Sequence, residues 1–309
     1  MIVIDGHCDT ITKIMDHGQL LSKNDFHVDI EKLRTFENSV QFFAVYLEEE
    51  SKLTEPLKHT LGYIDYFYGQ LALNCGEIGL VRSSKDIETN LESGRLSALL
   101  SIEGGEALEG ELENLKLLYD RGVRCLTLTW VRENDIGAGS GLPGGLTDFG
   151  KNVVLKMNEL GMIVDVSHLN DEGFWDVVRS CRKPFIASHS NAKKLCPHKR
   201  NLEDDQIKAI AASNGVIAVT LVKQFLNCEP EKAGIDDVLA HIDYILGVAG
   251  EDYLALGSDF DGFSLGPPRG FEDITRYAGL YEKLKEIYST ELADKIFYKN
   301  FLRVIKEVL

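Results

Sequence analysis

The sequence Ile-Val-Ile-Asp-Gly-His-Cys-Asp-Thr, residues 2–10, joins a short apolar run directly to two residue types that bind metals. The run predicts a buried strand over residues 2–6. His7 and Asp9 then stand two apart at its carboxyl end, where they either close a polar turn or hold a metal ion. One His-x-Asp pattern is too short and too common to separate these interpretations. Other strand ends must therefore supply further ligands.

Seven more runs share this length and this content of β-branched and aliphatic residues. They occupy residues 38–46, 97–102, 122–129, 161–166, 184–188, 215–220 and 253–258. Continuous apolar runs are typical of strands buried on both faces of a parallel sheet. Helical periodicity lies between them, most clearly over residues 150–160 (ended by Gly161), 236–246 (ended by Gly247) and about 290–309. The pattern predicts the α/β class and a (β/α)8 TIM-type barrel.

The 309 residues fit one barrel domain, residues 1–309, because no linker, low-complexity stretch or fixed-period repeat divides them. No Gly-x-Gly-x-x-Gly follows a predicted strand, which weakens a dinucleotide-binding interpretation. Two long glycine-rich loops, 137–150 and 263–270, follow the fourth and eighth predicted strands. Both should lie at the C-terminal mouth, where barrel enzymes keep their sites.

Composition limits which classes of binding partner and which cellular compartment we expect for this protein. The chain is 44% hydrophobic and 27% charged, an ordinary soluble composition, and its net charge of −16 argues against nucleic acid and anionic membranes. No apolar run is long enough to cross a bilayer, and the N-terminus lacks a signal-peptide pattern. The six cysteines form no Cys-x-x-Cys pair. We expect a cytoplasmic protein with reduced thiols.

Four further predicted strands end in metal-ligand residue types, namely Glu103, His168, His189 and Asp259. In a closed barrel these ends converge with His7 and Asp9 on one axial patch. Three imidazoles and several carboxylates exceed the needs of one tetrahedral zinc ion, so the set favours two ions.

Each of these residues also has a structural interpretation when taken alone. His168 or His189 could be a hydrogen-bonded core histidine, and Asp259 could cap a helix. Their shared position at strand ends favours a metal-binding role over these structural ones. The remaining histidines lack this position, and we expect structural roles for His17, His27, His59 and His241, with His198 in a surface loop. Asp5 and Asp165 lie within strands, where they could orient ligand imidazoles.

Seven motifs then occur in a specific order along nearly the whole chain. They are Asp-Gly-His-Cys-Asp (5–9), Glu-Gly-Gly (103–105), Leu-Thr-Leu-Thr (126–129), Gly-Met-Ile-Val-Asp-Val-Ser-His (161–168), Ala-Ser-His-Ser-Asn-Ala (187–192), Lys-Arg-Asn-Leu (199–202) and Gly-Ser-Asp-Phe-Asp-Gly (257–262). Together they resemble the membrane dipeptidase (renal dipeptidase) family of zinc metallopeptidases, within the amidohydrolase-like barrels.

The resemblance implies a metallo-dipeptidase with two zinc ions per subunit and a water activated between them. It implies that His7 and Asp9 hold one ion, that His168 and His189 hold the other, and that Glu103 bridges both. By the same resemblance, Asp259 is the acid/base residue and Arg200 binds the carboxylate of a small dipeptide. The dipeptide can carry a C-terminal D-residue, and a homodimer is possible.

Trp130 departs from this family, since the animal members have a histidine there that polarises the scissile carbonyl. Trp130 is therefore expected to contact substrate, and His198 is an alternative donor. Three other functions stay open: an N-acyl-amino-acid deacylase, a lactonase, and a non-catalytic metal- or peptide-binding protein. Arg200 favours substrates with a free carboxylate, and Asp259 argues against mere binding.

Overall fold

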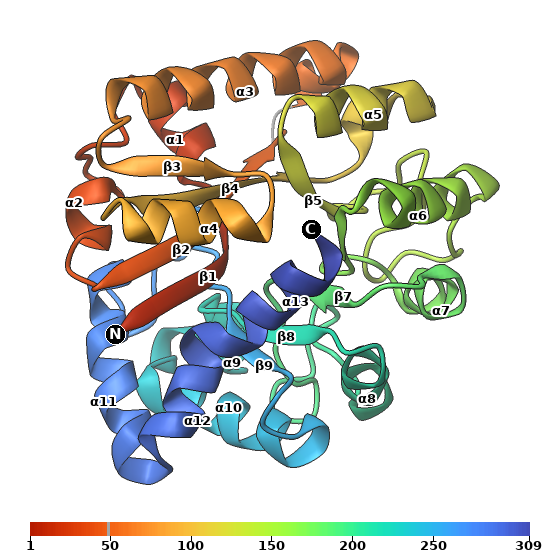
Figure 1. Cartoon of the computed structure of the whole chain (residues 1–309). Coiled ribbons are helices and arrows are strands. Elements are labelled where there is room, and N and C mark those ends of the chain that lie inside the picture. Colours follow the sequence, from red (N-terminus) through yellow and green to blue (C-terminus); the bar gives the residue numbers. More distant parts are fainter. Residues whose placement is uncertain (48–49) are drawn as a thin grey trace.

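All strands of the computed structural model, which describes residues 1–47 and 50–309, belong to one parallel sheet (Figure 1). They are β1 (Ile2–Cys8), β2 (Asn38–Tyr46), β3 (Ile78–Val81), β4 (Leu96–Glu103), β5 (Val123–Thr127), β6 (Ile163–Asp165), β7 (Phe185–Ala187), β8 (Val216–Val219) and β9 (Leu254–Leu256).

Helices follow most strands and form the outer layer. The α-helices are α1 (Thr10–Asp16), α2 (Ile30–Leu33), α3 (Pro56–Leu73), α4 (Ser84–Glu92), α5 (Leu112–Asp120), α6 (Asp148–Leu160), α7 (Asp171–Ser180), α8 (Asp204–Ala212), α9 (Lys223–Leu226), α10 (Ile235–Ala249), α11 (Tyr277–Ile287), α12 (Thr290–Asp294) and α13 (Asn300–Val308). Short 3-10 turns are η1 (Glu50–Thr54), η2 (Glu106–Leu108), η3 (Pro230–Lys232) and η4 (Ile274–Arg276), and η5 (Lys295–Lys299) is a π-helical turn. Among the described residues, no helix is both long and apolar enough to cross a membrane.

The sheet closes into a barrel because β2 pairs with β4 as well as with β1. Eight strands form the closed ring in the order β2-β1-β9-β8-β7-β6-β5-β4, which confirms the predicted (β/α)8 fold. β3 lies outside this ring and was not predicted. It pairs with Leu96–Leu99 of β4, whereas β5 pairs with Leu100–Glu103, so two strands share one edge of β4.

Several predicted boundaries were wrong by a few residues. β2 has the predicted limits. β1 and β4 extend beyond their predicted limits, and β5 to β9 are shorter than predicted, so that Ser188 and Ser258 lie beyond the ends of β7 and β9. Gly247 does not end its helix. α10 continues to Ala249 and stops at Gly250, whose φ of 93° breaks the helical conformation.

The C-terminal segment is not one regular helix, because η5 interrupts it. Ile296 and Phe297 pack in the layer between strands and helices, whereas Phe301 and Val304 pack inside the barrel. A π-helical turn changes the phase of a helix face, which suits a segment that must supply both layers.

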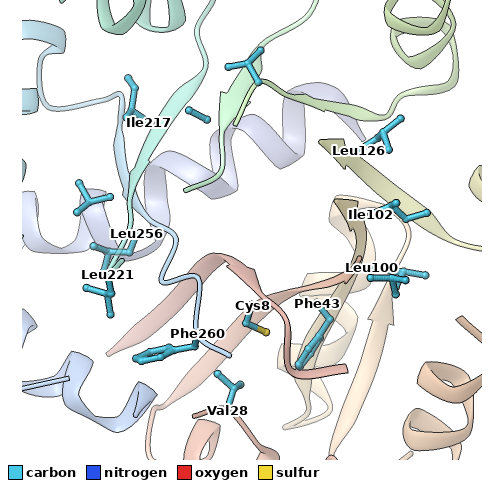
Figure 2. Close-up of a cluster of buried hydrophobic side chains, with 14 of the residues drawn as sticks. Cys8, Val28, Phe43, Leu100, Ile102, Leu126, Ile217, Leu221, Leu256 and Phe260 are labelled. Atoms are coloured by element: carbon cyan, nitrogen blue, oxygen red, sulfur yellow. The ribbon is translucent and has the colours of Figure 1, made fainter. Parts of the chain in front are cut away.

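Two apolar clusters hold the fold together. The larger fills the space between the barrel and its helices, and Figure 2 shows part of it, including Phe43, Leu100 and Phe260. The smaller lies inside the barrel, where residues from the N-terminal parts of the strands meet α13. Figure 1 shows α13, in dark blue, lying across this end of the barrel.

The barrel interior changes from apolar to polar along the strands. Side chains on one face of a strand recur every second residue, so Leu99, which packs inside, is followed on the same face by Ser101 and Glu103. Likewise Ile163 is followed by Asp165. The interior is therefore sealed at the N-terminal end and carries its ionisable groups at the C-terminal mouth.

We expect Phe301→Ala to destabilise the protein by about 3–5 kcal/mol, the usual cost of removing a large buried aromatic ring. Phe301 is 1% exposed and closes the barrel interior against Phe42, with ring centroids 5.3 Å apart. Urea unfolding measures the change. Ile287→Ala is the control, because Ile287 is 55% exposed and should cost less than about 0.5 kcal/mol. Equal midpoints for the two variants would contradict the role of α13.

Candidate metal centre

The ligands predicted from the sequence meet at the C-terminal mouth of the barrel. Strand β1 supplies His7, and Asp9 follows it; Glu103 is the last residue of β4. His168, His189 and Asp259 come from the turns after β6, β7 and β9. All six side chains are buried, from His189 at 0% exposed to Asp259 at 9%.

Glu103 lies at the centre of this group and faces ligands on both sides. Its Oε1 lies 2.8 Å from His168 Nε2 and 3.4 Å from His189 Nε2. Its Oε2 lies 3.7 Å from His7 Nε2, which in turn is 3.6 Å from Asp9 Oδ1. One carboxylate therefore contacts two separate sets of ligand residues.

The candidate ligand atoms have the spacing that a metal ion requires, and several of them lack a protein partner. His7, Glu103 and His189 offer atoms within 4.8 Å of one another, and so do His7, Asp9 and Asp259. The buried atoms His7 Nε2, Asp9 Oδ1 and His189 Nε2 have no hydrogen-bond partner. Buried polar atoms are rarely left unsatisfied, so this arrangement fits cations at the centre of the group.

Two of these residues adopt a left-handed backbone conformation. His168 has φ 67° and Asp259 has φ 62°, which is uncommon for residues other than glycine. Hydrogen bonds hold both turns: Ser140 N donates to the His168 carbonyl, and Asp259 N donates to the His7 carbonyl. Such strained positions concentrate at functional sites.

Gly262 allows Asp9 and Asp259 to approach each other. A Cβ at position 262 would lie 2.1 Å from Asp9 Oδ2 and 2.3 Å from Asp259 Oδ1. Only glycine leaves that space, which explains the Asp-Gly pair at the end of the last motif.

A chain of hydrogen bonds fixes the orientation of His189. Asp165 Oδ2 accepts a hydrogen bond from Ser188 Oγ at 2.6 Å, and Ser188 Oγ lies 2.8 Å from His189 Nδ1. Because the hydroxyl proton goes to Asp165, Ser188 Oγ accepts from His189 Nδ1–H. The lone pair of the imidazole is then on Nε2, toward Glu103.

Asp5 lies away from His189, where β1 pairs with β9. Its carboxylate accepts hydrogen bonds from His7 N at 3.1 Å, Ser258 N at 3.0 Å and Tyr277 Oη at 2.6 Å. Asp5 therefore fixes the backbone that carries His7 and holds it beside the turn that carries Asp259.

We expect Ser188→Ala to weaken metal binding about 10–100-fold, the usual effect of losing a group that orients a ligand. His189 would lose the acceptor that keeps its proton on Nδ1. Competition with a metal-binding dye measures the affinity. Ser190→Ala is a matched control, since Ser190 is also buried near His189 but its Oγ has no hydrogen-bond partner. Equal affinities in the two variants would show that the Ser188 contact does not matter.

The surroundings of His168 and His189, which face Oε1 of Glu103, favour the neutral form of both imidazoles. Burial lowers the pKa of His168 to about 4, assisted by the positive charge of Arg200. Burial, together with the charge on His7, also holds the pKa of His189 well below its usual value. Neutral imidazole is the metal-binding form, so these two histidines are ready to coordinate.

On the opposite side of Glu103, the carboxylates and His7 act on each other's charge. Burial acts to lower the pKa of His7, but the carboxylates of Glu103 and Asp9 outweigh it and raise that pKa well above its usual value. Burial raises the pKa of Asp9 to about 6, against the opposing effect of His7. A bound cation would displace the proton of His7, because both need the lone pair of the same imidazole nitrogen and both offset the charge of the carboxylates.

A cavity of about 230 Å³ opens from this cluster to the surface. Its lining consists of Asp9, Tyr46, Glu103, Trp130, Val131, His168, His198, Val222, Gln224, Phe225, Asp259, Gly262, Phe263 and Ser264. Trp130 lies over the ligand group, with its ring centroid 6.4 Å from that of His168. Of the two glycine-rich loops, the one over 263–270 contributes to the lining and the one over 137–150 does not.

Arg200 lies deeper than a surface ligand-binding residue. It is 5% exposed, its Nη2 donates to the His189 carbonyl at 3.3 Å, and its Nε has no partner. Burial lowers its pKa to about 10. The guanidinium is thus buried beside the ligand group, where the charges of Glu103 and Asp259 act on it.

The expectation of a surface position for His198 was wrong. His198 is half-buried, lines the cavity and stacks on Phe225 with ring centroids 4.5 Å apart. By contrast His241 is structural as expected, since Ala192 N donates to its Nδ1 and its Nε2 contacts the Leu226 carbonyl.

Several lining residues were not found by sequence reasoning. Tyr46, Gln224, Phe225 and Phe263 come from the end of β2, from α9 and from the loop after β9. Two of them carried a signal: Tyr46 is the last residue of a predicted strand, and Phe263 begins a glycine-rich loop predicted to lie at the mouth. Gln224 and Phe225 depend on how the segment around α9 folds over the mouth.

The whole chain, residues 1–309, matches the family described as "Membrane dipeptidase (Peptidase family M19)". An uncharacterised protein in the pqqA 5' region of Klebsiella pneumoniae is 36% identical over 264 residues, which is 79% of this chain and 97% of that protein.

Two solved structures have closely similar folds. The dipeptidase AC, a metallopeptidase of family M19, has a TM-score of 0.92 at 26% identity, covering 100% of this chain and 98% of its own. A metallopeptidase from Rhodobacter sphaeroides, liganded with a phosphinate mimic of the dipeptide L-Ala-D-Ala, has a TM-score of 0.91 at 26% identity, covering 100% and 99%. The chain therefore belongs to the membrane dipeptidase family, peptidase family M19, and is a metal-dependent dipeptidase.

Proposed function

We propose that this protein is a binuclear zinc dipeptidase. His7 and Asp9 would hold one ion, His168 and His189 the other, and Glu103 both. The observation that carries the proposal is the central position of Glu103, whose two oxygens face imidazoles of both sets. Imidazole and carboxylate are the usual ligands of zinc in hydrolases. When bound, zinc ions in such a pair lower the pKa of water and polarise a carbonyl group.

Asp259 would move the proton during hydrolysis. Its Oδ1 lies 3.9 Å from His7 Nε2, and the side chain lines the cavity. Burial raises its pKa well above that of an ordinary aspartate, although His7 opposes this. A carboxylate with a raised pKa accepts a proton from the attacking water and then gives it to the leaving amine.

The substrate would be a dipeptide with a free carboxylate. Arg200 has a planar guanidinium suited to a carboxylate, and one of its buried donor atoms is unpartnered. Trp130 supplies an apolar wall to the cavity. The ligand of the Rhodobacter sphaeroides relative supports a C-terminal D-residue as acceptable to this site.

Metal analysis combined with a dipeptide panel of defined stereochemistry tests the proposal. We expect two zinc ions per chain and hydrolysis that a chelator abolishes and added zinc restores. Full occupancy by zinc without hydrolysis of any dipeptide would contradict it.

Gel filtration tests the homodimer predicted from the resemblance.

We expect Arg200→Ala to raise KM about 10–100-fold and to leave metal content intact, because a hydrogen bond to a charged group contributes about 1.5–3 kcal/mol. The C-terminal amide of the same dipeptide is the matched control. It should be a poor substrate for the wild-type protein and lose little further in the variant. Equal KM values for acid and amide with the wild-type protein would instead favour a lactonase-like site, which has no need of a carboxylate.

A further inference from the structure

Two thiols lie side by side next to the cavity, although the sequence separates them by 32 positions. Cys228 Sγ is 4.0 Å from Cys196 Sγ. Cys196 is 3% exposed, and its thiol donates to the Gln224 carbonyl at 3.4 Å. Cys228 is exposed. The fold has thus brought one accessible and one buried thiol into contact.

The two cysteines belong to segments that together form one wall of the cavity. Cys196 precedes His198, whereas Cys228 closely follows α9, which carries Gln224 and Phe225. The Asn201 side-chain amide joins these segments, since its Nδ2 lies 2.8 Å from both the Cys196 carbonyl and the Phe225 carbonyl.

A second, separate cavity gives access to the pair. It has a volume of about 250 Å³ and is lined by Leu195, Leu226, Asn227, Cys228, Asp237, Ala240 and His241. Cys196 is not part of its lining. A small reagent in this cavity therefore reaches Cys228 first and leaves Cys196 to react from within the protein.

We propose that Cys196 and Cys228 form a reversible disulfide by exchange with a low-molecular-weight disulfide such as oxidised glutathione. In the first step the Cys228 thiolate attacks the reagent, forms a mixed disulfide and releases one glutathione thiolate. In the second step the Cys196 thiolate attacks Cys228 Sγ, which forms the internal bond and releases the second glutathione. The reagent gains two electrons and the two cysteines lose two electrons and two protons.

The thiol contact favours this order of steps. Burial raises the pKa of Cys196 to about 11, assisted by its contact with the Cys228 thiol. That contribution of Cys228 disappears once Cys228 is a mixed disulfide, which makes Cys196 more acidic when it has to react. Since the thiolate is the nucleophile, the second step is then easier than a direct attack by Cys196.

Closure of the bond would act on the cavity wall and not on the metal ligands. A disulfide has an S–S distance of about 2.05 Å, so the two sulfur atoms must approach by about 2 Å. Phe225 and His198 lie on the segments that would move, whereas Glu103 ends β4 and His189 is held by contacts with Ser167 and Ser188. Misplacing a substrate contact by about 1 Å can cost about 100-fold in rate.

Mass spectrometry after treatment with oxidised glutathione tests the bond itself. In the metal-loaded wild-type protein we expect loss of two hydrogens and a linked pair of peptides containing Cys196 and Cys228. Cys196→Ser should retain glutathione on Cys228, and Cys228→Ser should give neither product at these positions. Cys75→Ser is the matched control, because Cys75 is also exposed, and it should still form the linked pair. Stable glutathione on Cys228 of the wild-type protein, without linkage, would overturn the proposal.

The effect on activity rests on the dipeptidase function proposed above. We expect oxidation to lower kcat/KM for a dipeptide about 10-fold or more, reversibly with dithiothreitol and at constant zinc content. Cys228→Ser should be insensitive to the treatment. Formation of the Cys196–Cys228 disulfide without any change in kcat/KM would show that the bond does not alter the cavity wall. Absence of hydrolysis by the reduced protein would refute the dipeptidase proposal alone, since the linkage is measured by mass.

Discussion

Glu103→Gln is expected to lose both metal ions together and to reduce dipeptide hydrolysis by more than about 100-fold. Loss of a residue that only orients a metal ligand costs at most about 100-fold in metal affinity or activity, and loss of a ligand itself should cost more. Glutamine keeps the volume of the side chain but removes the charge that offsets two divalent cations. Because Oε1 faces His168 and His189 while Oε2 faces His7, neither ion would keep its full set of ligands.

Zinc content and affinity, measured by metal analysis and dye competition, check this result. His189→Ala is the comparison, since it should mainly weaken one ion. Glu106→Gln is the matched control: Glu106 is a largely buried carboxylate three positions further on, outside the ligand group, and its change should leave zinc content unaltered. Two bound ions and wild-type turnover in Glu103→Gln would overturn the site assignment.

The second large effect is expected for Asp259→Asn, which should lower kcat by about 100- to 10,000-fold, the range for losing a general acid–base group. Asparagine keeps the shape of the side chain and cannot accept the proton of the attacking water. KM should change little, because Arg200 and the cavity walls would still bind the substrate.

Steady-state kinetics on zinc-loaded protein, with zinc content measured in the same sample, separates this effect from metal loss. That measurement matters because Asp259 shares a ligand group with His7 and Asp9. Ser264→Ala is the control within the same loop and cavity, and it should keep kcat within a few-fold. A variant Asp259→Asn with two zinc ions and unchanged kcat would exclude the proton-transfer role.

The sequence predicted the barrel well because its strands are short, apolar and separated by amphipathic helices. It missed β3 (Ile78–Val81), whose apolar run is interrupted by Gly79. This strand pairs with the half of one β4 edge that β5 leaves free. The end of α10 was misplaced because glycine is tolerated inside a helix when the apolar face continues.

By itself the sequence determined which candidate ligands would meet at the barrel mouth, since the carboxyl ends of parallel strands in a closed barrel must meet. His7, Glu103 and His168 could therefore be brought together without coordinates. The tertiary structure alone buried Arg200 beside the ligand group, turned His198 toward Phe225 and brought Cys196 against Cys228. These relations depend on loop packing between segments far apart in the chain. The positions of strand ends follow from the repeating geometry of strands, which residue patterns reveal. The contacts between loops depend on the packing and hydrogen bonding at each place, which residue patterns do not reveal.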